Sequence, residues 1–105
     1  MIAHLLVMYP PQKDPVAFAR AYKEEHLPYA GPRLMGAGAT GVVSKKVAPA
    51  GDRLPYHAVS DVTFPSLQAL QACAESKGGK EALAHAASIS TGGAPEILIL
   101  TDDLV

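Results

Sequence analysis

The first and last strand-like segments of this chain are apolar on both sides, and this feature limits the possible folds most strongly. Successive side chains of a strand point to opposite faces of a sheet. Both alternating sets in residues 2–9 are mostly apolar: Ala3, Leu5, Val7 and Tyr9 against Ile2, Leu6 and Met8. Residues 95–101 repeat the pattern: Ile97 and Ile99 against Leu98 and Leu100. A sheet with one wet face alternates apolar with polar residues, so we expect both faces of this sheet to be covered.

A helix is expected directly after the first strand. Asp14 is a suitable N-cap, and Pro15 suits the first helical position, so the pattern predicts a helix over residues 15–26. Pro28 is expected to end this helix, because proline disfavours helical geometry in the residue before it.

Two strands and further helical segments complete the chain. The strands are expected at residues 40–47 and 55–64, joined by a connection of hairpin type. Ser66 predicts the cap of a second helix, which the glycine pair at 78–79 is expected to interrupt before a short helix at residues 80–87.

The resulting order, β-α-β-β-α-β, predicts an α+β protein of the ferredoxin-like fold, with an antiparallel four-stranded sheet and helices on one face. A chain of 105 residues is long enough for one domain, residues 1–105. Because the helices can cover only one face, we expect the other to pack against a second copy, sheet to sheet, in a homodimer.

Composition argues against several classes of partner. Nine Lys and Arg against ten Asp and Glu leave a formal charge of −1, without the basic stripe of a protein that binds nucleic acid or an anionic membrane surface. No apolar run approaches the roughly 18 residues of a spanning helix. The single cysteine, Cys73, cannot form an internal disulfide. We therefore expect a cytoplasmic protein with no nucleic-acid or membrane partner.

Tyr22 and His26 are the candidate catalytic residues. Four residues apart on a helix, they share one face with Phe18, a candidate substrate-contact residue. This face would meet the sheet, so a phenol and an imidazole, which can both transfer protons, would point inward. The structural alternatives are a histidine that interacts with the last helical carbonyls and a core tyrosine bonded to the backbone.

Three further polar residues are candidates for substrate binding. His4 lies within the first strand on the face of Ile2 and could line a pocket or be a hydrogen-bonded core residue. His57 and Asp61 are expected on one face of the third strand, where the carboxylate could orient a histidine or lie at a solvated edge. His85 is expected to be a surface or packing residue near Glu81.

Other motifs do not predict a cofactor site. The histidines lack metal-ligand spacing and no cysteine accompanies them, so no metal site is expected. Gly36, Gly38 and Gly41 match the spacing of a dinucleotide fingerprint, but they lead into a strand instead of following one. Cys73, on an apolar helix stripe, is expected to be an unreactive packing thiol. We therefore expect no cofactor.

An ordered set of motifs resembles the EthD family of the dimeric α/β-barrel superfamily along essentially the whole chain. The set comprises Met8-Tyr9-Pro10, Tyr22-xxx-His26-Leu27-Pro28, Phe64-Pro65-Ser66-Leu67 with Ala69 and Ala72, and the closing strand from Pro95. At residues 88–91 this chain has Ser-Ile-Ser-Thr where relatives often have an Asn-Phe pair, so one pocket wall should differ.

The resemblance implies a homodimeric barrel with a pocket between sheet and helices in each subunit. Similar proteins are associated with bacterial degradation of ethyl tert-butyl ether and are commonly classed under oxidoreductase activity. Relatives in the wider superfamily include polyketide cyclases, cofactor-free monooxygenases, muconolactone isomerases and heme-linked enzymes, so the fold does not define the reaction.

These expectations favour a small-molecule enzyme or accessory protein in bacterial catabolism of an organic compound. Its substrate would lie between the first helix and the sheet, with His26 moving a proton, Tyr22 holding an oxygen, and His4 a possible second polar group in the pocket. One alternative is a cofactor-free lyase, cyclase or isomerase that uses the same pair. Another is a catalytically silent dimeric binding protein.

Overall fold

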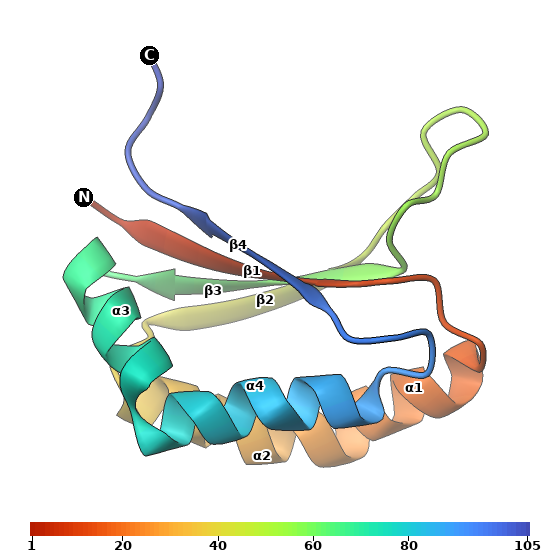
Figure 1. Cartoon of the computed structure of the whole chain (residues 1–105), viewed down its shortest axis with the longest axis horizontal. Coiled ribbons are helices and arrows are strands. Elements are labelled where there is room, and N and C mark those ends of the chain that lie inside the picture. The colour runs from red at the N-terminus through yellow and green to blue at the C-terminus, as the bar shows by residue number, and fades with distance from the viewer.

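Four strands form one antiparallel sheet in the computed structural model, which describes residues 1–105 (Figure 1). The strands are β1 (Ala3–Tyr9), β2 (Gly41–Lys46), β3 (Ala58–Phe64) and β4 (Glu96–Leu100). They lie in the order β2-β3-β1-β4, so β1 pairs with β3 on one side and β4 on the other. This arrangement confirms the predicted α+β, ferredoxin-like fold.

The helices lie together on one side of the sheet (Figure 1). They are α1 (Pro15–Ala21), the π-helix η1 (Tyr22–His26), α2 (Leu27–Gly36), α3 (Leu67–Glu75) and α4 (Lys77–Ile89). Two caps agree with the sequence prediction: the Asp14 carboxylate accepts a hydrogen bond from Ala17 N at 3.0 Å, and the Ser66 hydroxyl accepts one from Ala69 N at 3.0 Å.

Pro28 does not end the first helix, contrary to the prediction. The chain instead widens into η1, where the Leu27 N–H donates to the Tyr22 carbonyl, and then continues as α2 to Gly36. Pro28 thereby falls in the first turn of α2, where a missing N–H costs no hydrogen bond. One π-helical turn thus lets a proline remain inside a longer helical segment.

The glycine pair at 78–79 does not interrupt a helix either, because both glycines lie in the first turn of α4. Ser76 joins the two helices: its hydroxyl donates to the Cys73 carbonyl at 2.6 Å and accepts from Gly79 N at 3.0 Å. A Cβ at Gly79 would lie only 1.9 Å from the Cys73 carbonyl oxygen. Glycine is therefore required at this close junction between α3 and α4.

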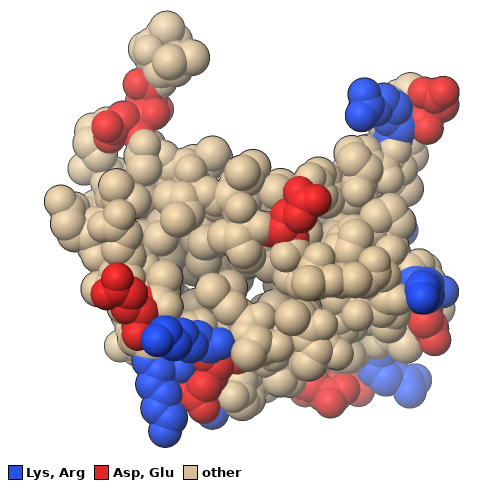
Figure 2. All heavy atoms as spheres, viewed as in Figure 1, with Lys and Arg blue, Asp and Glu red and all other residues tan.

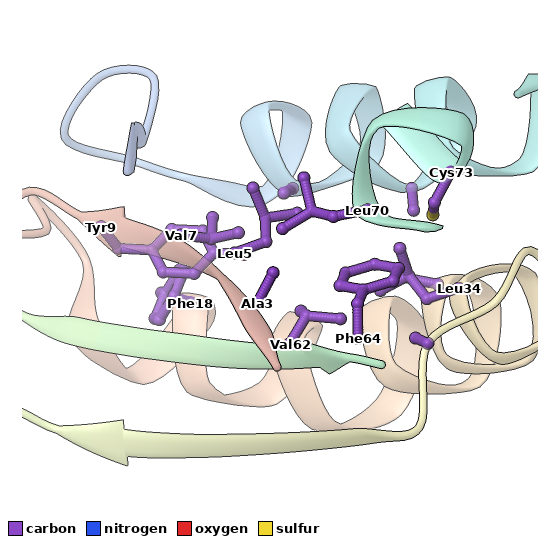
Figure 3. Packing of buried hydrophobic residues seen from close by; sticks show 14 residues of the cluster. Ala3, Leu5, Val7, Tyr9, Phe18, Leu34, Val62, Phe64, Leu70 and Cys73 are labelled. Atoms are coloured by element: carbon purple, nitrogen blue, oxygen red, sulfur yellow. The ribbon is translucent and has the colours of Figure 1, made fainter. Parts of the chain in front are cut away.

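The core lies between the sheet and the helices (Figure 3). Inward-facing strand residues such as Val7, Val62 and Phe64 pack with Leu34 of α2. Cys73 is also buried there, and burial raises the pKa of its thiol. Its role as a packing residue agrees with the sequence prediction.

The opposite face of the sheet is not covered by any helix (Figure 1). The apolar side chains of Val43, Leu98 and Leu100 are 56%, 48% and 46% exposed. Figure 1 also shows two extensions on the side away from the helices: the connection between β2 and β3, and the C-terminal tail after β4. In Figure 2 charged side chains gather over the helices and these extensions, and the layer between the extensions shows an acidic side chain near its middle among mostly uncharged residues.

Candidate functional site

Three hydroxyl groups meet where η1 faces the sheet. The Tyr22 hydroxyl hydrogen-bonds Ser60 Oγ at 2.7 Å and also Ser44 Oγ, and the two serine oxygens lie 3.0 Å apart. Ser44 of β2 and Ser60 of β3 are direct partners in the sheet, so both point to the helix side. Since each hydroxyl can donate and accept, the cluster can rearrange to hydrogen-bond an oxygen of a ligand.

His26 lies behind this cluster and is only 7% exposed. Its Nδ1 is 2.9 Å from Nδ1 of His85, so one ring donates the hydrogen and the other accepts it. The pKa of His26 is lowered to about 4, mainly by burial of the ring and to a lesser extent by the neighbouring His85. His26 is therefore a neutral imidazole at pH 7, and its ring centroid lies 5.2 Å from that of Tyr22.

His85 is a member of this site that the sequence prediction missed. Its ring stacks parallel to His26 and also stacks on Tyr29, with centroids 5.2 and 4.6 Å apart respectively. The predicted partner, Glu81, instead approaches Arg33, with Oε1 3.8 Å from Nε. Buried Ala82 and Ala86 mark the inner face of α4 beside His85, and this spacing was the available signal.

A small cavity lies inside the helix–sheet interface. Its volume is about 20 Å³, which is close to the space that one water molecule needs. Tyr22, His26 and Ser60 line it together with Tyr9, whose buried hydroxyl has no hydrogen-bond partner within the chain. Burial, and then Tyr22, raise the pKa of the Tyr9 phenol, which stays protonated and able to donate.

A larger groove opens to solvent next to this cavity, with a volume of about 340 Å³. We call it the β2 groove. Its walls include Phe18, Tyr22 and Leu27 from the helices and Ser44, Lys46 and His57 from the sheet side. Tyr22, Leu27 and Ser60 border both the groove and the inner cavity. The hydroxyl cluster therefore separates an open site from a buried one.

The predicted substrate-contact residues divide between the two faces of the sheet. His57 lies before β3 begins, and its ring packs edge-on against Phe18 on the helix side, with centroids 5.5 Å apart. Asp61 lies on the open face, where its Oδ1 is 2.8 Å from Nδ1 of His4. The expectation that His57 and Asp61 share a face is wrong, because strand alternation does not extend back to His57.

His4 is separated from the helix–sheet pocket. It pairs with Thr63 and Leu100 across the sheet, and its side chain lies on the face opposite to Tyr22 and His26. It therefore cannot contribute a polar group to the pocket of its own subunit, contrary to the sequence-based hypothesis. His4 and Asp61 form a separate, half-exposed pair.

The remaining motifs give no further site. Gly36 ends α2 and Gly41 begins β2, so the glycine motif joins a helix to a strand, the reverse of a dinucleotide-binding turn. No group of three or more potential metal-ligating His, Cys, Asp or Glu side chains comes together. None of the helices is long and apolar enough to span a membrane.

Solved structures share this fold, although no protein-family model and no curated protein matches the chain. An ethyl tert-butyl ether D (EthD) family protein from Bacillus halodurans C-125 superimposes with a TM-score of 0.83 at 15% identity, over 98% of this chain and 100% of that chain. An EthD-like protein from Ralstonia eutropha JMP134 gives a TM-score of 0.72 at 23% identity, over 95% of this chain and 90% of that chain. A dimeric ferredoxin-like protein of unknown function from Jannaschia sp. CCS1 gives a TM-score of 0.65 at 17% identity, over 97% of this chain and 100% of that chain.

These similarities confirm the predicted resemblance to EthD proteins at the level of the fold. They do not transfer an activity, because one fold supports many reactions.

Proposed function

We propose that residues 1–105 form one EthD-like domain, a member of that family, which acts as a cytoplasmic homodimeric enzyme or accessory protein in the catabolism of a small organic compound. The observation that carries this proposal is the convergence of Tyr22, Ser44 and Ser60 hydroxyls at the floor of the β2 groove. A solvent-open hollow with apolar walls and a few convergent polar groups is typical of a small-molecule site.

Tyr22 holds and polarises an oxygen of the substrate in this proposal. Its phenol already exchanges hydrogen bonds with Ser60 and Ser44, so a substrate oxygen can replace one of these partners without leaving a group unsatisfied. Phe18 and Leu27 contact the apolar part of the substrate at the groove wall. This gives Tyr22 the role of hydrogen-bond or proton donor.

His26 acts in this site as a neutral imidazole. A pKa of about 4 makes it a weak proton acceptor at pH 7, so the base strength first expected of it is not available while the imidazole stays buried. Instead it orients groups in the inner cavity, where the unpartnered Tyr9 hydroxyl is a second donor. The two buried groups can serve a substrate portion that passes between Tyr22 and Leu27.

The geometry favours oxygen-directed acid–base chemistry, of the kind that a lyase, cyclase or isomerase performs. An oxidoreductase reaction of the EthD type would use the same groove to hold the substrate oxygen. Oxygen or electron-acceptor consumption during turnover separates these two classes of reaction.

A catalytically silent dimeric binding protein is the second candidate, and the size of the inner cavity favours it. At about 20 Å³ the cavity admits no organic molecule unless Tyr22 or Leu27 moves. In such a protein the hydroxyl cluster would only bind its ligand, with no turnover.

Dimerisation through the open sheet face is supported by three observations. The face exposes apolar side chains of β2 and β4, and the two extensions beside it carry exposed Leu54 and Leu104. A solved structure with this fold is described as dimeric. Burying this apolar surface against a second copy would stabilise both subunits.

The site is tested by a small-molecule screen that follows thermal unfolding of the wild-type protein and the Tyr22→Phe variant. Ligands of the groove should stabilise the wild-type protein and bind Tyr22→Phe about tenfold more weakly, since one buried hydrogen bond is lost. Tyr56→Phe is the control, because the Tyr56 hydroxyl bonds Glu96 at the surface. Equal binding of every ligand by the wild-type protein and Tyr22→Phe would contradict the proposal.

A further inference from the structure

The β2 groove has a cationic side chain and no carboxylate in its lining. Lys46 and the ionisable His57 line it, without any Asp or Glu. Lys45 also borders the groove, but as the residue between Ser44 and Lys46 it directs its side chain to the other face of the sheet. The ion pairs of the protein are His4–Asp61 and Arg33–Glu81, so neither lysine has a carboxylate partner. An uncompensated ammonium group beside an apolar hollow attracts anions.

Lys46 is placed on the same side of the sheet as the hydroxyl cluster. It follows Ser44 by two residues on β2 and pairs with Ala58, while Ser44 pairs with Ser60. Residues two apart on a strand share a face. The ammonium group therefore belongs to the rim of the groove whose floor carries Tyr22, Ser44 and Ser60.

The helix wall of the groove is aromatic and apolar. The Phe18 ring lies 5.9 Å from Tyr22 and 5.5 Å from His57, centroid to centroid, and Leu27 extends this surface. Edge-on and tilted rings at such distances offer faces and edges for a further planar group. A volume of about 340 Å³ lies at the small end of the range for ligand pockets.

We propose that the β2 groove takes a small aromatic or unsaturated carboxylate that carries a second oxygen function. The carboxylate lies at Lys46, the planar body lies against Phe18 and Leu27, and the second oxygen bonds the Tyr22–Ser44–Ser60 cluster. This inference rests on the proposed function and narrows its substrate to an organic anion. An ammonium beside apolar surface discriminates an anion from a neutral molecule of equal shape.

The test uses 4-hydroxybenzoate as the anionic probe and 4-hydroxybenzamide as its neutral counterpart, at pH 7. Binding is followed by backbone amide NMR, which locates the site and gives the affinity in one titration. We expect 4-hydroxybenzoate to shift the amides of residues 44–46 and 57–60 and to bind about threefold or more tightly than the amide. Lys46→Gln should remove this preference, and added salt should weaken it.

Lys80→Gln is the matched control, because Lys80 is an exposed lysine of α4 outside the groove lining. It should bind both probes as the wild-type protein does. Equal affinity for the two probes, with Lys46→Gln unchanged, would overturn the anion proposal and leave the Tyr22 site intact. Probe shifts confined to other residues, or no shifts at all, would also overturn it, and the separate Tyr22→Phe screen then decides whether the groove binds any organic molecule.

Discussion

The two faces of the sheet each carry a histidine-containing cluster, but in opposite surroundings. On the helix side, His26 is buried against His85 beside three hydroxyls and an open groove. On the bare side, His4 and Asp61 form one ion pair among exposed apolar residues. The first cluster is built from several elements and borders a cavity. The second lies on two neighbouring strands, and nothing in the chain covers it.

This difference shows how the two faces of one sheet can serve different purposes, a ligand site on the helix side and a surface for a partner on the bare side. Burial on the helix side lowers the pKa of His26 and leaves an inner cavity of only about 20 Å³ beside it. The bare side keeps its polar pair solvated and presents apolar surface to a partner. Residue type alone does not distinguish the two clusters, since both contain a histidine with a nearby ionisable partner.

The largest effect is expected from charges on the bare face. Leu98→Glu combined with Leu100→Glu places two carboxylates on the exposed side of β4, opposite Leu6 and His4. Burying unpaired charges costs several kcal/mol, so sedimentation velocity should show a dimer for the wild-type protein and a monomer for the variant at about 10 μM.

Val16→Glu is the control for that experiment, because Val16 is exposed on α1, away from the bare face. It should remain a dimer. A monomeric wild-type protein, or a dimeric double variant, would show that the bare face is not the interface.

Acid should destabilise the protein through His26. Between the ordinary histidine pKa of 6.5 and the value of about 4 in the folded protein, the unfolded chain binds more protons. Stability should therefore fall as the pH decreases through this range, by about 3 kcal/mol in total. Urea unfolding from pH 7 to pH 4 measures this loss.

The His26→Gln variant should lose most of that pH dependence. His57→Gln is the matched control, because it removes a groove histidine outside the buried pair. If His26→Gln lost as much stability between pH 7 and pH 4 as the wild-type protein, the buried imidazole of His26 would not be the cause of the acid destabilisation.

Replacing a valine by alanine should lower the free energy of unfolding more on the helix side of the sheet than on the bare side. Val62 of β3 is 2% exposed, whereas Val43 on the neighbouring strand β2, which pairs with Asp61, is 56% exposed on the other face. Val62→Ala should destabilise by about 2 kcal/mol and Val43→Ala by about 0.5 kcal/mol or less. Urea unfolding in the monomeric Leu98→Glu, Leu100→Glu background measures both, and equal costs would show that the faces are equally covered.

The smallest effect is expected from the His4–Asp61 pair. Both side chains are more than a third exposed, so His4→Gln should change the stability of the monomeric variant by about 0–1 kcal/mol. Asp61→Asn is the reciprocal variant, and the double variant completes a cycle. A coupling well above 1 kcal/mol would mean that this pair is as strongly organised as the buried cluster.

The predicted helix boundaries were wrong at two residues that usually break helices, because the backbone accommodates both of them. Pro28 and Gly79 were expected to end or interrupt helices, because their local preferences oppose helix interiors. A π-helical turn and a close junction of two helices placed both at helix starts instead. Such solutions depend on the carbonyls of Tyr22 and Cys73, which local patterns do not locate.

The site prediction was limited by the same reliance on local pattern. Tyr22, His26 and Phe18 were placed on one inward face, because a helical repeat of four residues survives the π-turn between them. His85 and Ser60 were missed, since they reach the site from α4 and β3. His57 was assigned to the wrong face because the strand begins one residue after it.

The sequence by itself determined the order of elements, the ferredoxin-like fold and the apolar character of both sheet faces, because each depends on the spacing of side chains along a short segment. Only the tertiary structure decided which polar groups meet. The hydroxyl cluster joins Tyr22, Ser44 and Ser60 across up to 38 positions of the chain, and His26 meets His85 across 59. Packing of helices on the sheet creates these contacts, and the burial that it brings makes His26 chemically different from His4.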